Sequence, residues 1–212
     1  DRFYIRSLDG WFIPYDFNPV TMTASRIQPT ATGAGGLLIQ SQVVEPQFSF
    51  RSRDVIFGAW RDQTATDGFN YPVIRKYDFS TGAYTELLNL RPYTTPDTTA
   101  PCPPERPTWC DDTYASALAS SATAPERISV MFNGRGQDWH YKVAVFEVGA
   151  PQSSLVVLDT LASTVTRGGV PAPVAPLAFR LHHAWIDQTG RWVVLYPVSA
   201  NPVHFIVWDL TN

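Results

Sequence analysis

Short apolar segments separated by polar turns are the dominant pattern of this chain, and they are clearest in its last 33 residues. Three such segments follow one another there: Leu181–Ile186, Arg191–Tyr196 and Val203–Leu210. They are rich in Trp, Val, Ile, Tyr and Phe, the residues that favour strands. Asp187–Gly190 joins the first two, and its first Asp and last Gly suit a tight turn. We therefore expect a three-stranded antiparallel meander in this part of the chain.

The strand that ends near Asp209 has three counterparts earlier in the sequence. Each carries an aromatic residue followed by an acidic one near its end. The acidic residues are Asp16, Asp78, Glu147 and Asp209, and they are 62, 69 and 62 residues apart. So regular a spacing predicts an internal repeat. Because these acids recur with the structural period, we expect them to serve a turn or an inter-strand hydrogen bond rather than catalysis.

Up to four strands can be placed in each period, within a single domain whose units span about 1–28, 37–90, 113–160 and 180–212. The first unit lacks its first strand and the last unit lacks its fourth. The strands expected in the first three units are Phe3–Leu8, Trp11–Phe17 and Met22–Ile27; Gln47–Arg51, Asp54–Trp60, Val73–Phe79 and Tyr84–Leu88; and Thr113–Ser120, Arg127–Asn133, Tyr141–Val148 and Leu155–Leu158.

Several units of four antiparallel strands, with almost no helical periodicity, describe the blades of a β-propeller. The last unit, HAWIDQTGRWVVLY followed by HFIVWDL, resembles the TolB-type and WD-type repeats. In those repeats a Trp-Ser-Pro-Asp-Gly turn leads to one strand and then to a Tyr/Trp-Asp-Leu strand. Here Ile186–Gly190 takes the place of that turn, without the Pro and with the Gly displaced. The resemblance implies an all-β propeller and leaves the function open.

About three and a half blades are present, which is fewer than most closed propellers contain. We expect the chain to supply roughly half of a seven- or eight-bladed ring. A second chain, a cleaved partner or a further segment would complete it. A four-bladed ring, its last sheet finished by another strand, is the alternative. Exposed strand edges at the ends would otherwise promote aggregation.

Composition narrows the class of partner. The chain is 44% hydrophobic and 13% aromatic, which is ample for a folded core. Its net charge of −3 argues against nucleic acid or an anionic membrane as partner, since both attract basic surfaces. No segment approaches the roughly 18 apolar residues of a membrane span. The sequence opens on Asp1 without a Met or a leader, so we expect a processed chain or a piece of a longer one.

Cys102 and Cys110 flank the proline-rich segment CPPERPTWC. A disulfide between them is our preferred interpretation, and it predicts a secreted or periplasmic protein. Closing so short a loop would stabilise the fold by roughly 2.5 kcal/mol. Two free thiols in a cytosolic loop are the alternative. We expect no zinc site here, because no second pair of ligands has a suitable spacing.

In such a blade the first and third strands run in the same direction, so the connections that enter them share one face of the ring. Loops on one side of a rigid scaffold are the usual place for a site. The long connections on that face are Arg61–Asn70, Arg91–Asp112, Gly134–Trp139 and Leu161–Pro176. From these loops and the adjoining strands we expect ligand contacts by Trp109, Arg135, Asp138, Trp139, His140, His182 and His183.

All four histidines fall near that face, where imidazole can act as a general base, a metal ligand or a structural residue. His182 and His183 should lie on opposite sides of their strand unless the strand is bulged. We expect His183 to pack between Leu181 and Trp185, and His204 to be a structural strand residue.

Three functions remain open, and the sequence does not decide whether the protein is an enzyme. The first is a secreted propeller that binds a protein or a glycan through its loop-rich face, without a cofactor. The second is a polysaccharide lyase or hydrolase. The architecture of some lyase families would make His182, His140 and Arg180 the base, ligand and charge neutraliser, with a divalent metal only in this case. The third is a structural or assembly subunit. If the side chains of His182 and His140 point into one solvent-filled funnel, within reach of a metal or of each other, the enzyme is favoured. If they are apart and packed against aromatic residues, binding or scaffolding is favoured.

Overall fold

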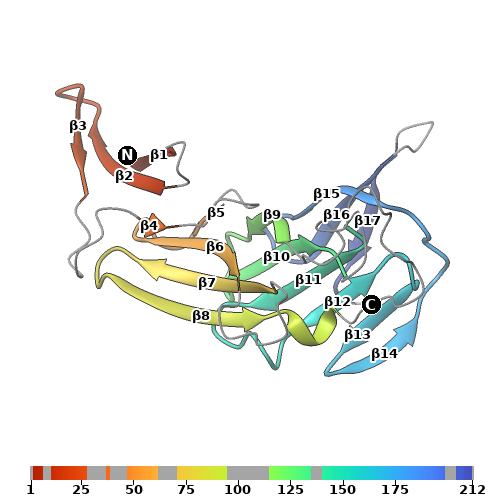
Figure 1. The fold of residues 1–212 in the computed structure, drawn as a ribbon. Coiled ribbons are helices and arrows are strands. Elements are labelled where there is room, and N and C mark those ends of the chain that lie inside the picture. Colours follow the sequence, from red (N-terminus) through yellow and green to blue (C-terminus); the bar gives the residue numbers. More distant parts are fainter. Residues whose placement is uncertain are drawn as a thin grey trace, which may run out of the picture.

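The computed structural model describes residues 2–6, 11–27, 37–38, 47–61, 71–94, 115–134, 140–198 and 204–211. The fold is all-β, as expected from the sequence, and its strands form four antiparallel sheets (Figure 1). Within the described ranges, the only helical element is a short 3₁₀ turn, Arg91–Tyr93. The four sheets follow one another along the chain.

The first and second sheets largely follow the predicted strands. In the first sheet β2 pairs with β1, β3 and β4; the strands are β1 (Arg2–Arg6), β2 (Trp11–Asn18), β3 (Thr23–Arg26) and β4 (Leu37–Leu38). The second sheet has its strands in chain order: β5 (Gln47–Phe48), β6 (Val55–Arg61), β7 (Pro72–Asp78) and β8 (Ala83–Asn89). The main difference is β5, which is shorter than the predicted Gln47–Arg51.

The third sheet has six strands where the sequence predicted four. Its strands, again in chain order, are β9 (Ala115–Ser120), β10 (Arg127–Phe132), β11 (Lys142–Glu147), β12 (Val156–Asp159), β13 (Thr164–Arg167) and β14 (Val170–Pro173). The prediction of an irregular connection over Leu161–Pro176, and of a unit that ends near residue 160, is therefore wrong.

The unexpected β13–β14 hairpin has a clear local cause. Gly168 and Gly169 have φ of +55° and +80°, the positive values that a two-residue hairpin turn requires. In this register Pro171 and Pro173 lie opposite Thr166 and Thr164, outside the hydrogen-bonded pairs, on the outermost strand of the sheet. Their missing N–H groups are therefore not needed for pairing. The Gly-Gly pair was the signal that the sequence interpretation overlooked.

The fourth sheet is the predicted three-stranded meander. Its strands are β15 (Leu181–Ile186), β16 (Trp192–Pro197) and β17 (Ile206–Asp209). Asp187 stabilises the first turn, because its carboxylate accepts hydrogen bonds from the Thr189 and Trp192 amides at 3.1 and 2.9 Å. The first and fourth sheets lie at opposite ends of the described fold (Figure 1).

The hydrophobic core consists of two layers on either side of the third sheet. Alternate residues of its strands point to opposite faces. Ile128, Phe132 and Phe146 pack against the second sheet, whereas Met131, Val143 and Val145 pack against the fourth. Burial on both faces explains why β10 and β11 read as nearly continuous apolar runs. The third sheet is thus the centre of the described structure.

The recurring acidic residues have structural partners, which confirms the interpretation from the sequence. Asp16 accepts from Arg2 Nε at 3.0 Å, Glu147 from Arg127 Nη2 at 2.9 Å, and Asp209 from Arg191 Nη2 at 2.7 Å. In each case the arginine stands at or just before the start of the neighbouring strand. The fourth acid, Asp78, accepts from the Ser80 amide at 2.9 Å and so closes a turn.

Candidate functional site

A β-bulge in β15 brings two of the predicted site residues together. Leu181 pairs with Pro197 and His183 with Tyr196, so one extra residue of β15 is accommodated between them. Leu181 and Ala184 are buried, whereas His182 and His183 are both exposed. The bulge was the exception allowed for these two histidines, and it is present. We expected His183 to pack between Leu181 and Trp185. The bulge places it on the exposed face, away from the buried Leu181, and its ring contacts Trp185.

Ring contacts join these histidines to three aromatic residues of the fourth sheet. His182 contacts Tyr196 with ring centroids 5.2 Å apart, and His183 contacts Trp185 at 5.3 Å. Phe205, just before β17, contacts both Trp185 at 5.9 Å and Tyr196 at 5.3 Å. We call these five residues the aromatic surface. It lies on the face of the fourth sheet that points away from the third.

The aromatic surface is open to solvent. Phe205 is 58% exposed, and Val207, on the adjoining strand, is 56% exposed. Trp185, Val194 and Val207 form a row across the sheet, because each faces the next in the strand register. In this row Val207 is exposed, and Trp185 and Val194 are half-buried. Contiguous apolar side chains that reach the solvent in this way mark interaction surfaces. The imidazoles add hydrogen-bonding groups to a mainly apolar patch.

The other two histidines are in different surroundings. His140 pairs with Leu181 through an isolated bridge, and its carbonyl accepts from the Leu181 amide at 2.9 Å. Burial lowers the pKa of His140 to about 4, so its imidazole is neutral at pH 7. His204 precedes β17 and is exposed, so the expectation of a structural strand residue is wrong.

The proposed catalytic trio of His182, His140 and Arg180 lies around the start of β15. Arg180 Nε donates to the Tyr141 hydroxyl at 3.1 Å, while His182 lies against the Tyr196 ring. The side chains of Arg180 and His182 thus each contact a tyrosine. Within the described ranges, no group of three or more His, Cys, Asp or Glu residues could hold a metal ion.

Several predicted site residues lie outside the described part of the chain: Trp109, Arg135, Asp138, Trp139, Cys102 and Cys110. The expected disulfide and the loop contacts therefore remain predictions. Sequence reasoning also missed residues, namely Trp185, Tyr196 and Phe205. A usable signal was present for Tyr196, which alternates along β16 with the buried Val193 and Leu195.

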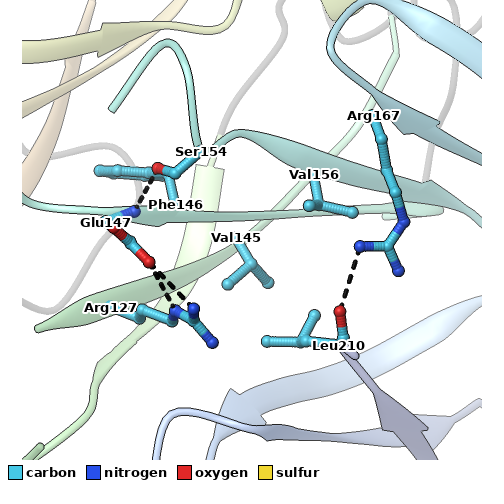
Figure 2. Close-up of a pocket in the computed structure, with 8 residues that line it drawn as sticks. All are labelled: Arg127, Val145, Phe146, Glu147, Ser154, Val156, Arg167 and Leu210. Atoms are coloured by element: carbon cyan, nitrogen blue, oxygen red, sulfur yellow. Dashed lines mark hydrogen bonds and ion pairs between the residues drawn. The ribbon is translucent and has the colours of Figure 1, made fainter. Parts of the chain in front are cut away.

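A cavity of about 220 Å³ lies between the third and fourth sheets (Figure 2). Its charged groups have partners: Arg127 is paired with Glu147, and Arg167 Nη1 donates to the Leu210 carbonyl at 3.1 Å. Val145 and Val156 lie between these two pairs (Figure 2). The cavity is thus bordered by one ion pair within the third sheet and by one hydrogen bond that joins it to the end of the fourth, and none of the predicted site residues lines it.

Comparison with known proteins does not assign the chain to a class. No protein-family model matches it, and no curated protein gives a match. Among the residues that the structure describes, no helix is long and apolar enough to cross a membrane.

Proposed function

We propose that this chain is a secreted interaction domain of the β-propeller type that binds a protein partner through the aromatic surface. The observation that carries the proposal is the continuous set of ring contacts from His182 and His183 to Phe205 on an exposed sheet face. Aromatic side chains supply large contact area at low entropic cost, and they are enriched where proteins bind one another.

Three arrangements support the propeller interpretation. The strands of the second, third and fourth sheets follow chain order, and these sheets pack face to face in chain order as well. In addition, β9 contacts both β5 and β15, so the first strands of successive sheets adjoin. Innermost strands around a common axis would be arranged in this way. The sheets would then be blades of an incomplete ring.

A protein partner suits the aromatic surface better than a glycan does. The Phe205 ring is inclined by 74° to Trp185 and by 46° to Tyr196, so the three rings do not form one flat stacking platform. Such an uneven apolar surface suits interdigitating side chains of a protein partner.

We place binding ahead of polysaccharide chemistry because His182 and Arg180 each contact a tyrosine.

The binding proposal can be tested with a random peptide library displayed on phage. Selection is made on the wild-type chain, and each selected peptide is then measured against Phe205→Ser. A matched control is Phe50→Ser, because Phe50 is 55% exposed and belongs to the second sheet's first turn rather than to the aromatic surface.

We expect selected peptides to bind wild type and Phe50→Ser equally and Phe205→Ser at least roughly tenfold more weakly. Soluble polysaccharides are tested in parallel by affinity electrophoresis. Failure to select any peptide sensitive to Phe205→Ser would contradict the proposal, and polysaccharide binding lost in that variant would replace the protein partner with a glycan.

The secreted location rests on the expected disulfide between Cys102 and Cys110. Mass spectrometry after alkylation with and without a reductant tests it. We expect alkylation only after reduction; alkylation of both cysteines in the untreated chain would indicate free thiols and remove this support.

A further inference from the structure

Two of the junctions between consecutive sheets, first to second and third to fourth, share a simple arrangement. Arg2, at the start of β1, pairs with Asp16 in its own sheet, and its Nη1 donates to the Arg53 carbonyl of the second sheet at 2.7 Å. Arg127, at the start of β10, pairs with Glu147, and its Nη1 donates to the Gly190 carbonyl of the fourth sheet at 2.9 Å.

Both acceptor carbonyls occupy the same place in their sheets. Arg53 lies in the turn between β5 and β6, and Gly190 lies in the turn between β15 and β16. Each arginine therefore forms an ion pair with the acidic residue of its own sheet. Its Nη1 also donates a hydrogen bond to the first turn of the next sheet. A guanidinium suits this role because its planar fork presents several donors in fixed directions.

Arg191 has the first half of this arrangement. It stands just before β16, and its Nε and Nη2 donate to the two carboxylate oxygens of Asp209 at 3.2 and 2.7 Å. Its side chain is 51% exposed. In the part of the chain that the structure describes, its Nη1 donates no hydrogen bond to another sheet, and its guanidinium lies over the Trp192 ring at 4.4 Å. The sheet that packs on the fourth sheet is the third. Arg191 Nη1 thus belongs to the same sheet as the aromatic surface.

The opposite end of the molecule carries a second apolar face. In β1, Arg2 points to the second sheet, so the alternation of side chains directs Phe3 and Ile5 away from it. Phe3 is 38% and Ile5 48% exposed, and the Phe3 ring stacks on Tyr15 at 5.4 Å. Apolar faces thus occur on both end sheets of the described fold, and these sheets lie far apart (Figure 1).

We infer that the aromatic surface binds the outer face of the first sheet of a second copy of this chain, so that copies join head to tail. This inference rests on the proposed function and names its partner. Phe205, Trp185 and Val207 would pack against Phe3 and Ile5 of the other copy. The Arg191 guanidinium would donate to a backbone carbonyl of that sheet, just as Arg2 and Arg127 donate to turn carbonyls of the neighbouring sheet within one copy.

A head-to-tail interface either closes into a ring or continues as a filament. Two copies joined at both ends would place eight sheets in one closed assembly, in agreement with the seven- or eight-bladed ring expected from the sequence. Closure would also cover both apolar faces, which the described residues of a single copy leave open.

Sedimentation velocity of the full purified chain, over a concentration series, tests this inference. We expect a species of twice the 23.6 kDa chain mass. Phe205→Ser and Ile5→Ser should each weaken association by roughly tenfold, whereas Phe50→Ser should leave it unchanged. Circular dichroism of each variant verifies the fold, and both substituted side chains are about half exposed, so folding should persist.

A mixture of the two weakened variants gives the most specific test. In the mixed dimer one interface is intact and the other carries both substitutions. Because Phe205 and Ile5 would contact each other, the second substitution in that interface costs little, so the mixture should associate more strongly than either variant alone. Arg191→Lys, which keeps the charge but loses the fork, should weaken association less than Phe205→Ser does.

A chain that is monomeric at every concentration would overturn the inference, and so would association that Ile5→Ser does not affect, because the aromatic surfaces would then meet each other. If the chain is monomeric yet selected peptides still bind in a Phe205-dependent way, the proposed function stands and only the second copy is excluded. If neither occurs, both fail.

Discussion

Ser129 provides a sharp test of the packing between the third and fourth sheets. Its side chain is fully buried, and its Oγ has no hydrogen-bond partner among the described residues. Ser129 lies opposite Val145 on β11 and Ala119 on β9. The hydroxyl is thus enclosed by apolar side chains on the face that packs against the fourth sheet.

We expect Ser129→Ala to stabilise the protein. A buried hydroxyl without a partner costs about 1–3 kcal/mol of desolvation free energy. Removing one oxygen leaves only a small void, which costs a few tenths of a kcal/mol at ~24 cal/mol per Å³. The net gain should be about 1 kcal/mol, equivalent to an increase in Tm of roughly 2–4 °C for a chain of this size.

Urea unfolding at pH 7 measures the effect, with Ser120→Ala as the matched control. Ser120 is also buried, but its hydroxyl donates to the Phe48 carbonyl at 3.2 Å. Its removal should therefore lower the free energy of unfolding by about 1 kcal/mol. The reasoning is refuted if both substitutions destabilise the protein to a similar extent, because the Ser129 hydroxyl would then have a partner as well.

Two further predictions concern pH and the β13–β14 turn. The folded-state pKa of His140 is about 4 against 6.5 when unfolded, so the unfolded chain binds the extra proton between these values and stability falls as the pH drops. We expect the free energy of unfolding to fall by about 3 kcal/mol from pH 6.5 to 4. Urea unfolding over this range should show a shallower decline of that free energy in His140→Gln. In the control His204→Gln, where the replaced side chain is exposed, the decline should match wild type. Gly169→Ala should lower the free energy of unfolding by about 1 kcal/mol because of its φ of +80°, whereas Gly149→Ala, equally open but without a positive φ, should be nearly neutral. Equal effects of the two alanines in thermal melts would contradict a strained turn.

Several features of the fold could be predicted because they depend on neighbouring residues along the chain. Alternating side chains and the turn at Asp187–Gly190 were sufficient for the meander of the fourth sheet. The spacing of the acidic residues was sufficient to assign them a structural role, which the pairing of three of them with arginines and the turn closed by Asp78 bear out. The β13–β14 hairpin was equally local, but the prolines of that segment obscured its Gly-Gly turn.

The candidate site depended on contacts between strands, and it therefore could not be predicted in the same way. The alternation rule separates His182 from His183, and only the register of β15 against β16 introduces the bulge that exposes both. Phe205 joins them because β17 pairs with β16, although 20 or more residues separate it from either histidine. Likewise, the low pKa of His140 results from burial, which no local pattern specifies.

By itself, the sequence determined the all-β class and most of the strands, since strand propensity and turn chemistry act over a few residues. Tertiary structure decided which sheet faces are buried and which are open, because burial depends on the sheets that pack on each face. Among the residues that the structure describes, the third sheet is covered on both sides, whereas the fourth is covered on one. That difference leaves the aromatic surface exposed, and the binding proposal rests on this exposure.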